Sequence, residues 1–95
     1  MSSAMTEVTL KITNQIGLHA RPAAVFYRKA REFKSQITIQ NLSRPETNMV
    51  PLTMMYLLQI GISAGHHICI RADGEDEQAA IAALAQLIEE NFGET

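Results

Sequence analysis

The chain has 95 residues and a formal net charge of −2, and 46% of its residues are hydrophobic. The length excludes two ordinary domain cores, and the charge excludes a global positive field of the kind that attracts nucleic acid. The single cysteine, Cys69, excludes an internal disulfide. No apolar stretch approaches the length of a membrane span, and the first ten residues lack the pattern of a signal peptide. We therefore expect a disordered extension at residues 1–5, a single domain over residues 6–95, and no membrane insertion.

A strand pattern and a helix pattern meet near the N-terminus. Residues 8–13 alternate between apolar and polar side chains, which predicts a strand with one buried face. Residues 14–17 break the alternation, and a helical pattern is present from Ala23 onwards. Between them lies the motif Gly17-Leu18-His19-Ala20-Arg21-Pro22-Ala23-Ala24. This motif is the strongest candidate site in the sequence.

The motif predicts an anion site at the start of a helix. Pro22 is expected to open the helix, because a proline suits a first helical turn, where its missing N–H would have no intrahelical partner. The free N–H groups of such a turn lie at the positive end of the helix dipole and favour a phosphate group. A nucleophilic imidazole at His19 and a guanidinium at Arg21 could then accept and release a phosphoryl group. The alternative is that His19 is only a helix cap or a surface residue.

The helix that follows has one apolar stripe and one basic stripe. Its apolar residues recur at the spacing i, i+3, i+4 and i+7, namely at Ala23, Phe26, Tyr27 and Ala30. Arg21, Arg28 and Arg31 lie close together on another side of the helix. Such a face is either solvated or a docking surface for a partner, and its position beside His19 keeps both interpretations open.

The middle of the chain predicts two strands and a short apolar helix. Residues 37–40 alternate as a strand does, residues 41–45 form a turn, and residues 47–50 form a short third strand. Pro51 then starts a helix over residues 52–60. This helix is apolar nearly all round, so one sheet cannot bury all of it. Its methionines are therefore expected to be exposed and to suit the binding of several partners.

The last third of the chain predicts a strand and a helix. Residues 68–71 alternate across a strand, with the two isoleucines on one face and Cys69 and Arg71 on the other. A turn follows at Asp73-Gly74, and the acidic residues around it lie where the start of a helix favours negative charge. The final helix is expected to end at Gly93 and to bury Ile81, Leu84, Ala85, Ile88 and Phe92.

Neither the histidines nor the acidic residues predict a metal site. His66 and His67 are adjacent on a strand, so their side chains point to opposite faces and cannot share one ion. The acidic cluster lacks the regular spacing of oxygen-ligand loops. We interpret both histidines as structural or surface residues and Cys69 as a small core or sheet residue. No metal and no cofactor are expected.

The predicted element order is strand, helix, strand, strand, helix, strand, helix. This order predicts an α+β fold, an open antiparallel sheet with helices packed on one face. Ferredoxin-like domains that bind small ligands or RNA share this layout. The layout alone therefore does not decide the function.

With this element order and this motif, the chain resembles HPr, the histidine-containing phosphocarrier family of the bacterial phosphoenolpyruvate-dependent phosphotransferase system. The resemblance runs from about Thr6 to Phe92, and its most specific part is the motif at residues 17–23. Ile60-Gly61 at the end of the short helix and the acidic run at residues 73–77 agree with it. The resemblance implies the open-faced β-sandwich of that family, with a four-stranded antiparallel sheet and three helices on one face.

The resemblance also implies a stoichiometric phosphoryl carrier rather than an enzyme with its own turnover. His19 would be phosphorylated on Nδ1, Arg21 would neutralise the phosphoryl oxygens, and the N–H groups of Ala20 and Arg21 would hold them. Phosphorylated enzyme I would donate the group, and IIA domains of the sugar branch would receive it. The docking surface would consist of Arg28, Arg31, Met54, Met55 and Leu58. We expect a cytoplasmic monomer that binds no nucleic acid.

Three positions in the short helix depart from the family pattern. The regulatory serine that an ATP-dependent kinase phosphorylates in some members falls at Thr53, which is the candidate regulatory phosphosite. Leu52 replaces a frequent lysine, and Tyr56 replaces a small residue, so we expect poor modification by such a kinase. These departures make a nitrogen-related or purely regulatory branch the alternative to sugar transport.

Two other classes of function are alternatives. An RNA-binding module would share the layout, but the acidic balance and the lack of stacking aromatic residues on the predicted strands argue against it. A regulator that keeps only the docking surface would need no phosphorylation, and the presence of His19 argues against that class.

Overall fold

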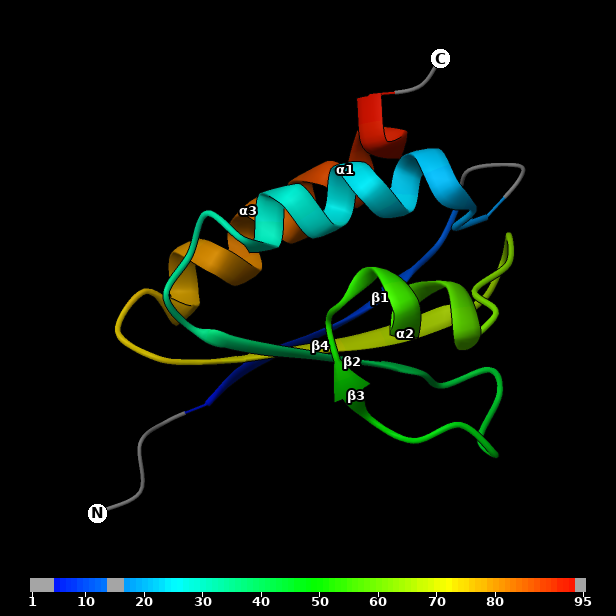
Figure 1. Ribbon diagram of the computed structural model, residues 1–95, viewed down its shortest axis with the longest axis horizontal. Coiled ribbons are helices and arrows are strands. Elements are labelled where there is room, and N and C mark those ends of the chain that lie inside the picture. Colours follow the sequence, from blue (N-terminus) through cyan, green and yellow to red (C-terminus); the bar gives the residue numbers. More distant parts are fainter. Residues whose placement is uncertain (1–4, 14–16, 94–95) are drawn as a thin grey trace.

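The structure, a computed structural model, describes residues 5–13 and 17–93. Its elements occur in the predicted order, which confirms the α+β class (Figure 1). Residues 1–4 of the expected extension and the predicted break at residues 14–16 lie outside the described residues. The elements are β1 (Thr6–Lys11), α1 (Ala20–Ala30), β2 (Gln36–Asn41), β3 (Val50–Pro51), α2 (Met54–Gln59), β4 (His67–Asp73), α3 (Glu77–Glu89) and a short 3-10 helix, η1 (Asn91–Gly93).

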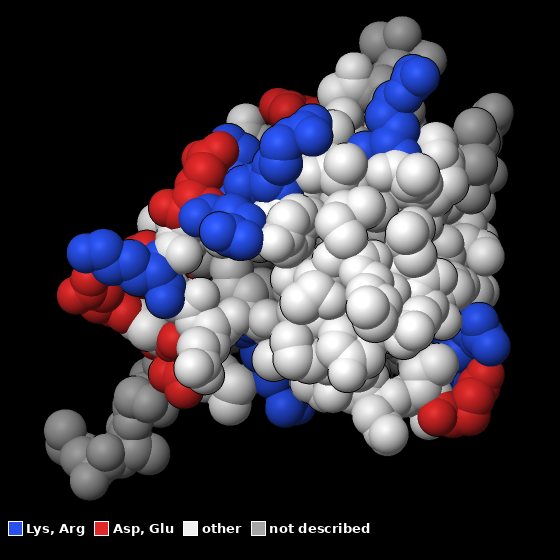
Figure 2. Space-filling view, in the orientation of Figure 1, with Lys and Arg blue, Asp and Glu red and all other residues white. Residues whose placement is uncertain are grey.

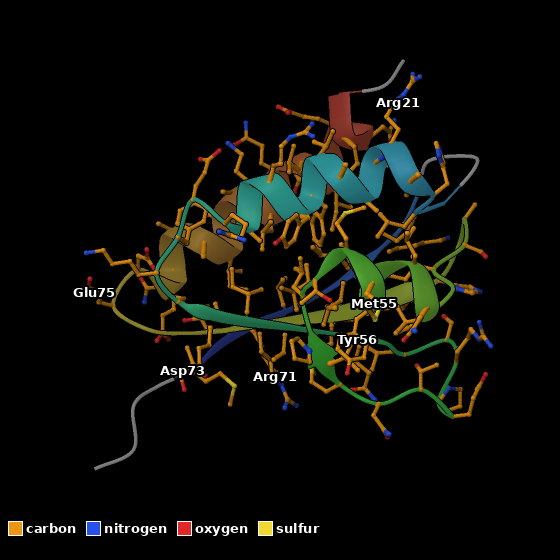
Figure 3. The ribbon with its side chains drawn as sticks, viewed as in Figure 1. Arg21, Met55, Tyr56, Arg71, Asp73 and Glu75 are labelled. Atoms are coloured by element: carbon orange, nitrogen blue, oxygen red, sulfur yellow. The ribbon has the colours of Figure 1, made fainter. Side chains whose placement is uncertain are left out.

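The four strands form one antiparallel sheet in the order β1-β4-β2-β3. Ile70 of β4 lies at its centre, paired with Val8 on one side and with Ile39 on the other. Figure 1 shows α1 and α3 side by side over one face of the sheet. The labelled side chains of Arg71 and Asp73 lie on the other side of the sheet (Figure 3). This is the open-faced arrangement that the sequence predicts.

The core lies between the sheet and the helices. Phe26 of α1 meets Phe92 of η1 edge-on, with ring centroids 5.8 Å apart. Burial of a large apolar side chain contributes about 1.5–3 kcal/mol, so this layer holds the helices to the sheet. Its fully buried members include Phe26, Ile39, Leu57, Ile68, Ile70 and Leu84.

Helix α1 begins earlier than predicted. Ala20 is its first residue and His19 is its N-cap, so Pro22 occupies the third helical position and does not open the helix. Proline is tolerated there because no N–H of the first turn has an intrahelical partner. The predicted apolar stripe is buried except for Tyr27, which is half-buried.

The segment before α2 differs from its prediction. The third strand is only Val50–Pro51, and Pro51 pairs with Thr38 at the edge of the sheet instead of starting a helix. An edge strand tolerates proline, which cannot donate to the ladder. Helix α2 starts later, at Met54, because Thr53 is its N-cap and accepts a hydrogen bond from its first turn.

The predicted C-terminal end of the last helix is wrong, whereas its start lies at the acidic residues, as predicted. Asp73 still belongs to β4, and Glu77 is the first residue of α3. The helix ends at Glu89 rather than at Gly93, and Phe92 lies in η1 with a positive φ of 58°. Phe92 is nevertheless buried. The predicted burial of Phe92 is therefore right, whereas its predicted helical conformation is wrong.

The acidic run lies at the start of α3, as predicted, and one of its carboxylates also has partners outside that helix. Asp76 is the N-cap of α3, but its carboxylate makes no hydrogen bond to that helix. It accepts hydrogen bonds from the backbone N–H groups of Lys34 and Ser35, at 2.7 and 2.9 Å. Asp76 therefore fastens the loop between α1 and β2 to the start of α3.

Candidate functional site

His19 lies at the start of the first helix, where the sequence predicts the candidate site. It is the N-cap of α1 with extended backbone angles, φ −93° and ψ −169°, and its side chain makes no capping hydrogen bond. The imidazole is half-buried. Its Nε2 atom is buried and has no hydrogen-bond partner within the described part of the chain. A buried polar atom without a partner is rare in proteins and is often associated with a functional site.

The first turn of α1 leaves backbone donors free beside this ring. Ala23 N–H donates to the carbonyl of His19 at 2.9 Å, so the first intrahelical hydrogen bond is in place. Pro22 has no N–H, and the N–H groups of Ala20 and Arg21 have no acceptor within the helix. These two donors lie at the positive end of the helix dipole. They can therefore receive an anion that is held close to His19.

Arg21 is exposed at the start of α1. Its side chain extends away from the body of the protein (Figure 3). Within the described residues it makes no hydrogen bond or ion pair, so its guanidinium is free to approach an anion at the helix start. The structure thus places His19, Ala20 and Arg21 at one helix start, as the sequence predicts.

Gly17, two residues before His19, is tightly packed. Gly17 has a φ of +80°, and a Cβ atom added there would lie 2.7 Å from Cα of Ser63 and 2.8 Å from the carbonyl oxygen of Ile62. The next residue, Leu18, donates its N–H to that same carbonyl at 3.0 Å. The backbone before His19 therefore rests directly on the segment that follows α2.

Helix α2 exposes an apolar surface, as expected. Met55 is 67% exposed, Leu58 is 48% exposed and Tyr56 is also exposed. Met54, however, is half-buried and packs against the core, so its predicted exposure is wrong. Figure 2 shows an uncharged face with lysine and arginine side chains gathered along one border of it.

The two arginines of the predicted basic stripe differ from each other. Arg28 and Arg31 are both exposed. Arg31 donates to the Tyr27 hydroxyl at 2.8 Å, and its guanidinium carbon lies 5.7 Å from the centre of the Tyr27 ring. Arg28 makes no hydrogen bond or ion pair with any described residue. Arg28 is therefore free to meet a partner, whereas Arg31 would first have to leave Tyr27.

Thr53 is already engaged in the structure of α2. As the N-cap, its Oγ1 accepts the N–H of Tyr56 at 3.2 Å. Thr53 as a whole is partly exposed. A phosphoryl group on Thr53 would therefore lie at the start of α2, beside the exposed apolar side chains.

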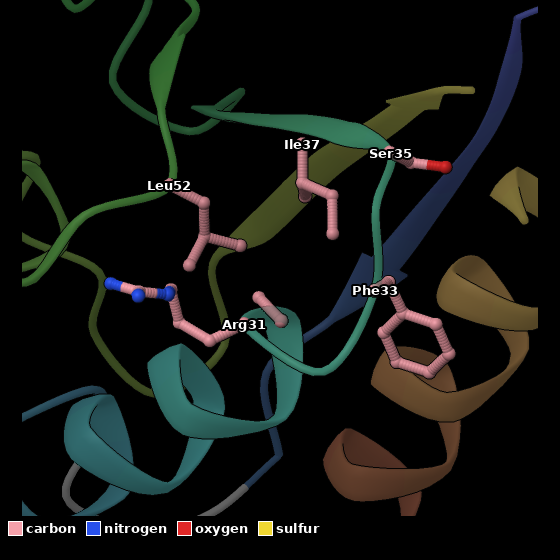
Figure 4. Close-up of a pocket in the computed structure, with 6 residues that line it drawn as sticks. Arg31, Phe33, Ser35, Ile37 and Leu52 are labelled. Carbon is pink, nitrogen blue, oxygen red and sulfur yellow. The ribbon is translucent and has the colours of Figure 1, made fainter.

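A shallow cavity of about 150 Å³ lies at the other end of α1 (Figure 4). It is separated from His19 by the length of an 11-residue helix, about 16 Å, so it is not part of the same site. Its lining residues are Ala30, Arg31, Phe33, Ser35, Ile37 and Leu52.

Residues 5–13 and 17–93 contain no group of three or more metal-ligating side chains that could hold an ion. His67 is exposed, and Cys69 is buried in β4. In that same part of the chain, none of the helices has the length and apolar character needed to cross a membrane.

Two polar residues outside the predicted site have structural hydrogen bonds, Asn41 unexpectedly and His66 in agreement with its interpretation as a structural or surface residue. Asn41, predicted to start a turn, ends β2 and is fully buried. His66 accepts a hydrogen bond from the N–H of Ser63 at 3.1 Å. A signal for Asn41 was present, because it continues the inward alternation of Ile37 and Ile39.

Comparisons with known proteins show the family of this chain. Residues 6–90 match the family model described as "PTS HPr component phosphorylation site". The chain is 39% identical over 83 residues to the phosphocarrier protein HPr of Borreliella burgdorferi, which covers 87% of this chain and 91% of that protein. The crystal structure of HPr-C-His from Thermoanaerobacter tengcongensis superposes with a TM-score of 0.86 and 42% identity, covering 95% of this chain and 98% of that one.

Longer proteins match as well. The multiphosphoryl transfer protein of Haemophilus influenzae is 37% identical over 86 residues, which cover 90% of this chain but 17% of that protein. The chain therefore spans about a fifth of the length of the multiphosphoryl transfer proteins that it matches.

Proposed function

This chain belongs to the HPr family, and we propose that it carries a phosphoryl group on His19 between proteins of a phosphotransferase system. The observation that carries the proposal is the position of His19 as the N-cap of α1, directly before two free backbone N–H groups. A phosphoryl group on the ring would lie beside these donors and the positive end of the helix dipole.

Nδ1 is the nitrogen that we propose as the acceptor. Nε2 is buried, and a donor protein cannot bring a phosphoryl group to a covered atom. In the neutral tautomer with the proton on Nε2, Nδ1 has a free lone pair. This lone pair attacks the phosphorus, the bond between phosphorus and the donor atom breaks, and the donor atom keeps the electron pair.

A carrier must hold the phosphoryl group without trapping it. The exposed Arg21 neutralises charge on the phosphoryl oxygens but remains partly hydrated, and the N–H groups of Ala20 and Arg21 supply neutral donors. In phosphoryl transfer, positioning and charge neutralisation contribute most of the catalysis. The partner protein supplies much of both, so we infer a stoichiometric carrier without turnover of its own.

The proposed donor is phosphorylated enzyme I, and the proposed acceptors are IIA domains of the sugar branch. Both would dock on the exposed apolar residues of α2, chiefly Met55 and Leu58, with Arg28 at the border. Arg31 and Met54 would take part only after leaving their present contacts with Tyr27 and with the core. We propose a cytoplasmic monomer, with a nitrogen-related or regulatory branch as the alternative to sugar transport.

The decisive experiment is incubation with enzyme I and phosphoenolpyruvate, followed by measurement of the intact mass. One phosphate should be added, and it should be lost in acid and retained in base. His19→Ala should abolish the addition while the domain stays folded. A phosphate that persists in His19→Ala would refute the assignment of the site.

A further inference from the structure

We propose that His66 is a positioning residue for phosphoryl transfer, which acts through the turn that supports the backbone before His19. The inference deepens the proposed function and rests on it. Among the described residues, the side chain of His66 has its hydrogen bonds with Asn41 and Ser63 and none with His19. Its effect would come from the hydrogen bonds that its Nδ1 atom accepts.

His66 makes two hydrogen bonds with Ser63 in the turn that follows α2, one through its backbone and one through its side chain. Its own N–H donates to the carbonyl of Ser63 at 3.0 Å. In return, the N–H of Ser63 donates to Nδ1 of His66 at 3.1 Å. The turn contains Gly65 with a φ of +87°, a conformation that glycine adopts without strain. The side chain of His66 thus supplies the acceptor for a backbone N–H within its own turn.

Asn41 provides the second donor to the same nitrogen. Its Nδ2 lies 3.0 Å from the carbonyl oxygen of Ile60 and 3.1 Å from Nδ1 of His66. Its Oδ1 accepts the N–H of Ser43 at 3.1 Å. The carbonyl oxygen of Gly61 is a third, longer contact of Nδ2 at 3.4 Å, so the two protons of the amide are directed at the Ile60–Gly61 backbone and at the imidazole. Because Nδ1 faces two donors, its own proton has no place there, and we assign the proton of the neutral ring to Nε2.

Backbone hydrogen bonds join this turn to Ile12, directly after β1, and to Leu18, directly before His19. The N–H of Ile12 donates to the carbonyl of His66 at 2.8 Å, and the carbonyl of Ile12 accepts the N–H of Gly65 at 2.7 Å. The N–H of Leu18 donates to the carbonyl of Ile62 at 3.0 Å. The close packing of Gly17 on Ser63 adds a steric contact. A shift of this turn would therefore move the backbone immediately before His19.

The same residues also reach the proposed docking helix. Ile60 is the C-cap of α2, and its carbonyl is held by Asn41. Hydrogen bonds thus connect the end of α2 through Asn41 and His66 to the turn under His19. A misplacement of about 1 Å can lower the rate of a positioned reaction about 100-fold. The network would therefore set the position of His19 relative to a partner bound on α2.

The test compares His66→Leu and His66→Asn with the wild-type protein. Leucine fills the space but accepts no hydrogen bond, whereas asparagine places a carbonyl oxygen near the position of Nδ1. The matched control is His67→Leu, because His67 is exposed and its side chain has no hydrogen bond within the described residues. Single-turnover transfer from phosphorylated enzyme I gives the maximal rate and the half-saturating concentration separately.

We expect His66→Leu to lower the maximal rate about tenfold or more, with the half-saturating concentration changed less than about twofold. His66→Asn should recover most of the rate, and His67→Leu should match the wild type. NMR of the imidazole nitrogens of the wild-type protein should show His66 protonated on Nε2 and not on Nδ1. If His66→Leu does not fold, Asn41→Ser, which removes the donor to Nδ1, should lower the maximal rate in the same way.

Several outcomes would overturn the inference. They are a folded His66→Leu variant with the wild-type rate, a His66→Asn variant as slow as His66→Leu, or a proton on Nδ1 of His66. If the wild-type protein accepts no phosphate at all, the proposed function fails. In that case the NMR measurement still decides whether the hydrogen-bond network exists.

Discussion

The carboxylate of Asp76 at the start of α3 accepts a hydrogen bond from the hydroxyl of Ser35, 41 residues earlier in the chain, at 2.5 Å. This bond and the one from the N–H of Lys34 lower the pKa of Asp76 below its ordinary value of 3.8. A carboxyl group with a lowered pKa stabilises the folded state above its unfolded pKa and loses that contribution as the pH falls through its folded pKa.

We predict that Asp76→Asn lowers the urea midpoint of unfolding at pH 7. Because the stabilisation needs the ionised carboxylate, the difference from the wild type should shrink as the pH falls below about 3.8 and into the folded pKa. Urea unfolding followed by circular dichroism at several pH values measures this. Glu75→Gln is the control, since Glu75 only forms an exposed ion pair with Lys34. A difference between Asp76→Asn and wild type that persists unchanged in strong acid would contradict the argument.

Gly17→Ala should lower both stability and phosphoryl transfer. The new Cβ would meet backbone atoms of Ser63 and Ile62 at 2.7 and 2.8 Å, and the positive φ adds strain of about 1–3 kcal/mol. Gly93→Ala is the control, because it has a similar φ of +78° but nothing within 4 Å of the added atom. Thermal unfolding and single-turnover transfer should both show the larger effect at Gly17. Equal effects of the two substitutions would mean that the close packing is unimportant.

Met55→Ala should weaken the binding of enzyme I by about 1 kcal/mol or more, as truncation of an interface anchor does. Because Met55 is 67% exposed, the free energy of unfolding should change little. Met54→Ala should instead destabilise the protein, since Met54 packs against the core. Calorimetric titration with enzyme I and urea unfolding distinguish the two variants. Wild-type binding by Met55→Ala would place the docking surface elsewhere.

Arg21→Ala should slow phosphoryl transfer while leaving the affinity for enzyme I nearly unchanged, because its proposed contact forms only with the phosphoryl group. Arg28→Glu should act oppositely and mainly slow association, with an effect that decreases as salt is added. Stopped-flow binding at two salt concentrations, together with single-turnover rates, separates these behaviours. If Arg21→Ala weakens binding as much as it slows transfer, Arg21 belongs to the docking surface.

Thr53→Ala should destabilise the protein by about 1 kcal/mol, because the Oγ1 that accepts the Tyr56 N–H is lost. Thr53→Ser keeps a hydroxyl at the N-cap and should remain within a few tenths of a kcal/mol of the wild type. Thermal unfolding measures both changes.

HPr kinase and ATP should label Thr53 of the wild-type protein far less than the serine of a family member that has one. Efficient labelling of Thr53 would contradict this expectation.

The sequence by itself determined the element order and the place of the site. Alternating residues in the strands and the stripe on α1 follow from the side-chain periods of two and 3.6, which act within a few residues. The motif around His19 predicts its own local structure in the same way, since a helix start requires free N–H groups wherever it occurs. Within this motif, only the position of Pro22 differs from the prediction, because a proline fits any position of a first turn.

The tertiary structure alone decided which residues support the site. Asn41 and His66 are distant from His19 in the sequence, and the hydrogen bonds of Asn41 to Ile60 and His66 exist only after β2 has come together with the end of α2 and the turn before β4. Likewise, Met54 and Met55 are indistinguishable in a helix that is apolar all round, and only the packing of α2 buries one and exposes the other. Local periodicity is a property of neighbouring residues, whereas burial and hydrogen-bond partnership depend on segments that meet through the fold.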